Sequence, residues 1–176
     1  MHADTIQTSR LTLIASSPEH LRAELEFPST LGTLLGAEIP PSWPPGEYDR
    51  GAQEFFLARL VESGSEAVGW FGWYAVRRAD SLHVATVVGA AGYFGPPSEE
   101  GVVEIGYSTC PEWRGRGYAT EMARALVEHA AAYPHVTRVV ARTNSDNAAS
   151  VAVLESCGFT REAPLAAAQW RYEFRC

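Results

Sequence analysis

The residues best suited to chemistry form a short loop in front of an amphipathic stretch. The loop consists of Arg114, Gly115, Arg116, Gly117, Tyr118 and Ala119. Its two glycines allow the backbone to approach a ligand closely, and the free N–H groups at a helix N-terminus attract phosphate. Arg114 and Arg116 could clamp phosphate oxygens, or one of them could simply be solvated. The loop therefore predicts a diphosphate-binding site.

A dinucleotide fingerprint fits this loop poorly. Such a fingerprint requires a third small residue at the position of Thr120. It also requires an acidic residue about twenty positions further on, where the chain has Thr137 and Arg138. Because neither requirement is met, the pattern disfavours a Rossmann-type site.

The elements on either side of the loop must position it. Val102–Ser108 is rich in β-formers and alternates in character, and Pro111 ends the strand because it has no N–H to donate. From Gly117 to Ala132 the apolar positions recur every three or four residues, which predicts a helix with one apolar stripe. A strand therefore feeds a glycine loop that opens a helix.

The rest of the chain is predicted to form strands and helices around this segment. Before it we expect a strand, two helices and a hairpin, at Leu11–Ala15, Pro18–Glu26, Asp49–Glu62, and Val68–Val76 with Leu82–Phe94. After it we expect a strand, a helix capped by Asn147 and a closing strand, at Val136–Arg142, Asn147–Cys157 and Ala168–Arg175. A crossover of this length makes the strands that start at Val102 and Val136 parallel neighbours. These elements predict one α/β (α+β) domain over residues 1–176.

The composition excludes several functions. The net charge of −7 disfavours nucleic acid and anionic membrane as partners. All 14 basic residues are arginine, and the absence of lysine excludes a Walker-A lysine and a Schiff-base lysine. Cys110, Cys157 and Cys176 show no paired spacing, so we expect reduced thiols and no metal site. No apolar run is long enough to span a bilayer, and we expect a cytoplasmic protein.

Several motifs, in the right order, resemble one family. Arg114-x-x-Gly117-x-Ala119 fits the Q/R-x-x-G-x-G/A signature of the GCN5-related N-acetyltransferases (GNAT). Further segments resemble the ribosomal-protein N-acetyltransferase branch, namely Thr8–Leu13, Glu104–Tyr107, Asn147-x-x-Ser150 and Leu154-x-x-x-Gly158-Phe159. The resemblance implies acetyl-CoA as co-substrate, no metal, and acetyl transfer to a primary amine by direct attack. It also implies a GNAT fold: a mixed, mostly antiparallel sheet of about seven strands, with about four helices and with parallel fourth and fifth strands that splay apart.

The same resemblance assigns roles to individual residues. The backbone N–H groups of Arg114 to Ala119 would cradle the pyrophosphate, and Asn147 would hold the pantetheine arm, a role compatible with a helix N-cap. Ser150 would protonate the leaving thiolate, unless it is an ordinary first-turn serine. Where the central strand ends, Thr109 and Cys110 are candidates to hydrogen-bond the acetyl carbonyl.

Glu104 is the candidate general base, because an ammonium substrate must lose a proton before it attacks. It could act through a water, or it could be a structural carboxylate of the sheet face. A base is not strictly required, since α-amines titrate at about pH 8. A covalent mechanism through Cys110 is disfavoured because no nearby histidine could act as its base.

The acceptor is the least defined part of the prediction. Its pocket should be built from Ile39–Arg50, the first hairpin and Pro164–Gln169. Three acids near one wall would suit a cationic amine: Glu38, Glu47 and Asp49. The acceptor could be a protein N-terminus or a small-molecule amine, and the chain could be a monomer or a homodimer. Two alternatives stay open, a sensor that binds acetyl-CoA without turnover and an enzyme that uses another acyl donor.

Overall fold

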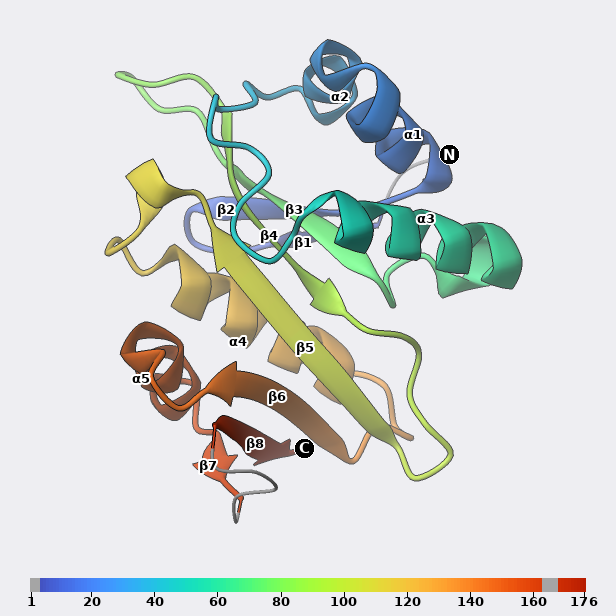
Figure 1. Ribbon diagram of the computed structural model, residues 1–176, viewed down its shortest axis with the longest axis vertical. Helices are drawn as coiled ribbons and strands as arrows, with labels where there is room; N and C mark the ends of the chain where they lie inside the picture. Colours follow the sequence, from blue (N-terminus) through green and yellow to red (C-terminus); the bar gives the residue numbers. More distant parts are fainter. Residues whose placement is uncertain (1–3, 163–167) are drawn as a thin grey trace.

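The structure, a computed structural model, describes residues 4–162 and 168–176 (Figure 1). Its strands form one sheet in the order β1-β2-β3-β4-β5-β6-β8-β7. The strands are β1 Thr5–Gln7, β2 Leu11–Ala15, β3 Gly72–Arg77, β4 Thr86–Tyr93, β5 Val102–Thr109, β6 Arg138–Asn144, β7 Thr160–Arg161 and β8 Gln169–Arg175. The helices are α1 Pro18–Glu26, α2 Pro28–Leu35, α3 Arg50–Ser63, α4 Tyr118–Ala131 and α5 Ala148–Ser156, with short 3₁₀ turns η1 Ser65–Ala67 and η2 Pro111–Trp113.

The sheet is antiparallel except between β5 and β6, which run parallel as predicted. Their pairing starts at Val102 with Arg138 and stops at Ile105 with Ala141, although both strands continue beyond these residues. Figure 1 shows the two arrowheads well apart, while the starts of the strands lie close together. The predicted splay is therefore confirmed, and it leaves a wedge between the carboxyl ends of β5 and β6.

Helix α4 packs its apolar stripe against one face of the sheet. The core there joins Val103 and Ile105 of β5 with Met122 and Leu126 of α4, all of them almost fully buried. A second cluster covers the opposite face and consists of Leu21, Tyr48, Phe56, Leu60, Ala67, Phe71 and Ala90. Because side chains alternate along a strand, the even-numbered residues of β5 point toward this second face, away from α4.

The sequence does not predict β1, α2 or β7. Pro28 occupies the first turn of α2, where its missing N–H costs nothing. Gly36 ends that helix with a left-handed φ of 60°. By contrast, β2 and α1 have the predicted bounds, and Asn147 caps α5 as expected.

The first strand of the predicted hairpin begins later than expected. The sequence predicts a strand from Val68, but β3 begins at Gly72. The intervening backbone bonds to itself, since the Val68 N–H donates to the Ser65 carbonyl at 3.3 Å and the Trp70 N–H to the Ala67 carbonyl at 3.0 Å. Local turns over residues 68–71 therefore replace the strand pairing that the β-forming residues there predicted.

The second strand of that hairpin is also shorter than predicted, because β4 begins at Thr86 rather than at Leu82. The N–H groups of Leu82 and His83 donate to Asp80 Oδ1 at 2.8 and 2.9 Å. An Asp side chain that binds the backbone ahead of it holds a turn, which explains the longer connection.

Within residues 4–162 and 168–176, no helix has the length and apolar character needed to cross a membrane. Over the same ranges, no three histidine, cysteine, aspartate or glutamate side chains gather in a way that could hold a metal ion.

Candidate active site

The wedge between β5 and β6 opens into a cavity of about 810 Å³. Its walls come from β5, from the loop before α4, from the end of β6 and from the start of α5. Most of the predicted site residues line it, namely Glu104, Thr109, Arg114, Gly115, Gly117, Tyr118, Ala119, Asn147 and Ser150. The structure therefore brings together side chains that are far apart in the sequence.

The loop in front of α4 has the backbone that a diphosphate requires. Gly115 and Gly117 have left-handed φ values of 69° and 81°, which residues other than glycine adopt at a cost. Gly117 is the N-cap of α4, and no side chain in the described chain caps this helix. Its first N–H groups are therefore available to an anion, and the helix dipole favours one there.

Arg116 does not line the cavity, unlike the rest of the loop. Its guanidinium lies 4.9 Å from the centre of the Trp113 ring, and its carbonyl accepts a hydrogen bond from Arg10 Nη1 at 2.8 Å. Arg114 does line the cavity, and its Nε donates to the Thr109 carbonyl at 3.2 Å. Of the two predicted phosphate clamps, the structure places only Arg114 at the cavity.

Arg10 and Glu121 hold this loop from behind, which the sequence reasoning missed. Arg10 Nη2 and Glu121 Oε2 lie 2.7 Å apart, and the Arg10 guanidinium covers the Tyr118 ring at 4.4 Å. Glu121 Oε1 also accepts from Thr8 Oγ1 at 2.5 Å. Partial burial acts to raise the pKa of Glu121, but the hydrogen bonds from Thr8 and Arg10 outweigh it and lower the pKa. The only signal for this contact was the Thr8–Leu13 motif.

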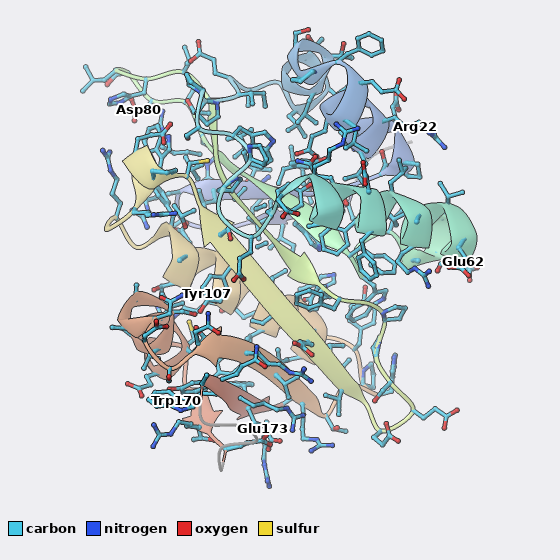
Figure 2. All side chains as sticks on the ribbon, in the orientation of Figure 1. Arg22, Glu62, Asp80, Tyr107, Trp170 and Glu173 are labelled. Carbon is cyan, nitrogen blue, oxygen red and sulfur yellow. The ribbon has the colours of Figure 1, made fainter. Side chains whose placement is uncertain are left out.

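Asn147, Ser150 and Tyr107 form a connected group on the wall opposite the loop. Asn147 Oδ1 accepts from the Ser150 N–H at 3.1 Å, so the predicted N-cap is real. The Tyr107 hydroxyl lies 3.0 Å from Ser150 Oγ, and Tyr107 sits beside the wedge (Figure 2). Burial raises the pKa of Tyr107 to about 12. Tyr107 is a candidate that the sequence reasoning used only as a family motif.

Thr109 faces the cavity, whereas Cys110 does not. The Cys110 side chain is buried, its N–H donates to the Val88 carbonyl at 2.9 Å, and burial raises the pKa of its thiol to about 11. Because peptide groups alternate in direction along a strand, the Thr109 N–H points away from β4, into the wedge. The buried Thr109 Oγ1 has no hydrogen-bond partner among the described residues. The geometry thus leaves Thr109, and not Cys110, able to meet a ligand.

Glu104 lines the cavity near the point where β5 and β6 separate. Its side chain is 28% exposed, and its Oε1 lies 3.5 Å from Arg142 Nε. Strand alternation places Glu104 on the same sheet face as Gly106 and Ser108, opposite α4. Arg142, which also lines the cavity, had no role in the sequence prediction.

A smaller cavity of about 90 Å³ adjoins the first one on this face. The two share Glu47, Phe94, Gly106, Tyr107 and Ser108. The smaller cavity is completed by Tyr48, Ala52 and Phe56 from the loop and α3, and by Ala90, Ala91, Gly92 and Tyr93 from β4. The predicted acceptor segment Ile39–Arg50 and the first hairpin therefore both reach this position.

The three acids expected near the acceptor have different surroundings. Glu47 lines both cavities at their junction. Asp49 Oδ1 accepts from the Ala52 N–H at 3.0 Å and so caps α3. Glu38 lines a third cavity elsewhere. Of the predicted segment 164–169, residues 164–167 lie outside the described residues, and Gln169 lines the larger cavity.

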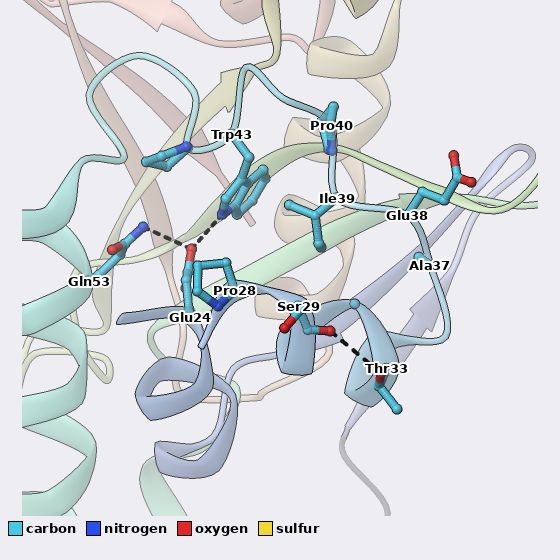
Figure 3. Close-up of a pocket in the computed structure, with 12 residues that line it drawn as sticks. Glu24, Pro28, Ser29, Thr33, Ala37, Glu38, Ile39, Pro40, Trp43 and Gln53 are labelled. Atoms are coloured by element: carbon cyan, nitrogen blue, oxygen red, sulfur yellow. Dashed lines mark hydrogen bonds between the residues drawn. The ribbon is translucent and has the colours of Figure 1, made fainter. Parts of the chain in front are cut away.

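The loop that carries Glu47 is tied to the rest of the fold by the buried carboxylate of Glu24 (Figure 3). Glu24 accepts hydrogen bonds from Trp43 Nε1 at 2.7 Å, Tyr48 Oη at 2.9 Å, Gln53 Nε2 at 2.8 Å and Tyr74 Oη at 2.7 Å. Burial is the largest influence and raises the pKa of Glu24, although these donors act in the opposite direction. Trp43 is thus a loop anchor, and it also lines the third cavity, of about 650 Å³.

Comparison with known proteins agrees with this geometry. A family model described as an acetyltransferase (GNAT) domain matches residues 10–160. The chain is 32% identical over 125 residues, 71% of each chain, to the uncharacterized N-acetyltransferase YjdG of Bacillus subtilis (strain 168).

Two solved structures share the fold at low identity. One is the RimL ribosomal L7/L12 alpha-N-protein acetyltransferase in complex with coenzyme A, with a TM-score of 0.68, 18% identity and 98% of each chain covered. The other is the ribosomal-protein-S5-alanine acetyltransferase from Vibrio fischeri, with a TM-score of 0.65, 15% identity, and 98% of this chain and 96% of that one covered. By its match to the family model and its 32% identity to this relative, the chain belongs to the GNAT acetyltransferases, enzymes that transfer the acetyl group of acetyl-CoA.

Proposed function

We propose that this enzyme acetylates a primary amine by direct attack of the amine on the acetyl carbonyl of acetyl-CoA bound in the wedge. The observation that carries the proposal is the single cavity that joins the phosphate loop, Glu104 and the Tyr107–Ser150 pair. In this arrangement the N–H groups of residues 115–119 hold the pyrophosphate, and Asn147 faces the pantetheine arm. The N–H of Arg114 donates to the Pro111 carbonyl at 3.3 Å, so Arg114 contributes the positive charge of its side chain.

The first half of the reaction takes place beside β5. Glu104, directly or through a water, accepts a proton from the substrate ammonium, and the freed nitrogen lone pair forms a bond to the acetyl carbon. Negative charge then develops on the carbonyl oxygen. The Thr109 N–H, which points into the wedge, is placed to stabilise that charge.

The second half breaks the carbon–sulfur bond and releases coenzyme A as a thiolate. A thiol has an ordinary pKa of about 8.5. Because the pKa of Tyr107 is about 12, complete proton transfer from Tyr107 to the sulfur is unfavourable. The Tyr107–Ser150 pair therefore acts by donating a hydrogen bond to the departing sulfur. The attacking nitrogen still carries one proton more than the amide product needs, and this proton passes to the thiolate directly or through solvent.

A thiol-release assay combined with calorimetry tests the proposal. We expect acetyl-CoA to bind, and free thiol to appear only when a suitable primary amine is added. Competition among acyl-CoA thioesters tests whether acetyl is the preferred group. Tight binding of acetyl-CoA without thiol release across peptides, polyamines, aminoglycosides and simple alkylamines would overturn the proposal.

A pair of glycine variants provides the control for the donor site. Gly117→Ala puts a side chain at a φ of 81° and a ψ of 6° beside the cavity, whereas Gly36→Ala does so at a φ of 60° and a ψ of 35° after α2, and Gly36 lines no part of the cavity. Both variants carry similar backbone strain, about 1–2 kcal/mol. Only Gly117→Ala should weaken acetyl-CoA binding.

A further inference from the structure

The small cavity beside the wedge is placed to hold the acceptor. It shares Glu47, Phe94 and Ser108 with the donor cavity, so a molecule in it adjoins the position of the acetyl group. Its floor is formed by small residues of β4 and β5, since Ala90 pairs with Ser108 across these strands. On the proposed function, this space therefore belongs to the group that bears the amine.

The cavity is apolar in spite of its tyrosines, because each tyrosine hydroxyl is engaged elsewhere. The Tyr48 hydroxyl donates to Glu24 at 2.9 Å, and the Tyr93 hydroxyl donates to the Leu126 carbonyl at 2.5 Å. The Tyr107 hydroxyl lies 3.0 Å from Ser150 Oγ. Tyr93 and Tyr107 direct their rings toward the α4 side of the sheet and border the cavity through their backbone. Tyr48 offers it ring carbon, so the walls favour an apolar group.

The size of the cavity limits that group. Its volume is about 90 Å³, against about 810 Å³ for the donor cavity, so it suits a compact group. Phe94 forms the outer wall and lies against the backbone of β5, where a side chain at Gly106 would come within 3.2 Å of its ring. Phe94 is 55% exposed, so it bounds the cavity on the solvent side without being part of the core.

Glu47 places a carboxylate at the junction of the two cavities, because it lines both. Glu104 lies on the same sheet face as the floor residues Gly106 and Ser108, but Arg142 Nε, 3.5 Å from its Oε1, balances part of its charge. Among the described residues that line the small cavity, none is an arginine or a histidine. An ammonium group is therefore favoured at the junction, with apolar atoms further in.

We infer that the acceptor is a primary amine carried on a compact aliphatic group. The aliphatic group occupies the small cavity, Glu47 attracts the ammonium, and Phe94 sets the upper limit on size. The same chemistry could come from a free alkylamine or from the N-terminal residue of a peptide. This inference rests on the proposed function and specifies its substrate.

The test is a thiol-release assay at saturating acetyl-CoA with a graded series of amines. Ethylamine, propylamine, hexylamine and phenethylamine probe size, and spermidine probes charge. Peptides that begin with valine or with tryptophan distinguish a peptide source from a free amine. We expect kcat/KM to be highest for the propyl-sized group, and to be lower by about tenfold for hexylamine and for the tryptophan peptide.

Variants of Phe94 and Glu47 test the roles of these two residues, each beside a control variant. Phe94→Ala should move the optimum to hexylamine or phenethylamine, while Phe55→Ala, an exposed phenylalanine of α3 that lines neither cavity, should leave the order unchanged. Glu47→Gln should lower kcat/KM for the amine by about tenfold without changing acetyl-CoA affinity, and Glu66→Gln should have no effect.

The results that would contradict the inference differ from those that would contradict the proposed function. Robust turnover with no dependence on amine size, or with a preference for spermidine, would overturn the inference and leave the proposed function intact. Unchanged selectivity in Phe94→Ala would also overturn it. Absence of turnover with every amine, in protein that still binds acetyl-CoA, would remove the proposed function and the inference with it.

Discussion

The guanidinium of Arg10 and the carboxylate of Glu121 meet at 2.7 Å and join the start of β2 to the first turn of α4. A further guanidinium nitrogen of Arg10, Nη1, donates to the carbonyl of Arg116, inside the phosphate loop. One arginine in the connection between β1 and β2 therefore contacts both the helix that carries the loop and the loop itself.

Replacing Arg10 should weaken the donor site more than it changes the chemical step. We expect Arg10→Ala to raise the Kd of acetyl-CoA by about tenfold, equal to ~1.4 kcal/mol, because the loop loses its anchor. The kcat at saturating acetyl-CoA should change little. Calorimetry and steady-state kinetics measure both quantities. Arg22→Ala, on the exposed side of α1, is the matched control, and equal losses in the two variants would contradict the anchoring role.

The Tyr107–Ser150 pair should contribute to departure of the thiolate. Tyr107→Phe and Ser150→Ala should each lower kcat by about tenfold, since a hydrogen bond to a charged group contributes ~1.5–3 kcal/mol. The double variant should lose less than the product of the two single effects, because the residues are in contact. Ser156→Ala, in the same helix, is the control. If Ser150 is only a first-turn serine, Ser150→Ala will match that control.

The role of Glu104 can be read from the pH profile. Glu104→Gln should lower kcat/KM for the amine at neutral pH, where the acceptor is mostly protonated. The loss should shrink as the pH rises above about 8, because free amine then forms without a base. Glu99→Gln, close in the sequence and exposed, should follow the wild-type profile. A loss of the same size at every pH would indicate a structural carboxylate.

The contribution of Glu24 to the free energy of unfolding should decrease as the pH rises, which is the reverse of the usual behaviour of a carboxyl group. Its pKa is raised in the folded protein, so the folded state binds its proton more tightly than the unfolded chain does. The resulting stabilisation is complete below the ordinary carboxyl pKa of about 4.3, and it is lost as the pH rises through the raised value.

Denaturant unfolding of the wild type and Glu24→Gln across this range measures the effect. The difference in free energy of unfolding, wild type minus variant, should decrease as the pH rises from about 4 to 7. Glu26→Gln, exposed on the same helix, provides the control. A difference that grows with pH would show that the four donors outweigh burial and that the pKa is not raised.

The sequence alone determined the features that depend on local chemistry. The short apolar run Leu11–Ala15, the proline that starts Pro18–Glu26 and the glycines before α4 identify their elements, because these signals act within a few residues. The donor loop could be predicted for the same reason. Its neighbours in the sequence, a strand and a helix, are also its neighbours in space.

Only the tertiary structure decided which distant groups meet. The contact of Arg10 with Glu121, the pairing of Tyr107 with Ser150 and the burial of Glu24 each join segments that no local pattern connects. The direction in which the Cys110 side chain points could not be predicted from the sequence either, since it depends on the register of β4 against β5. The acceptor cavity has the same origin, because its walls are set by how the proline-rich loop packs onto the sheet. Such packing depends on the whole core and not on any one stretch of sequence.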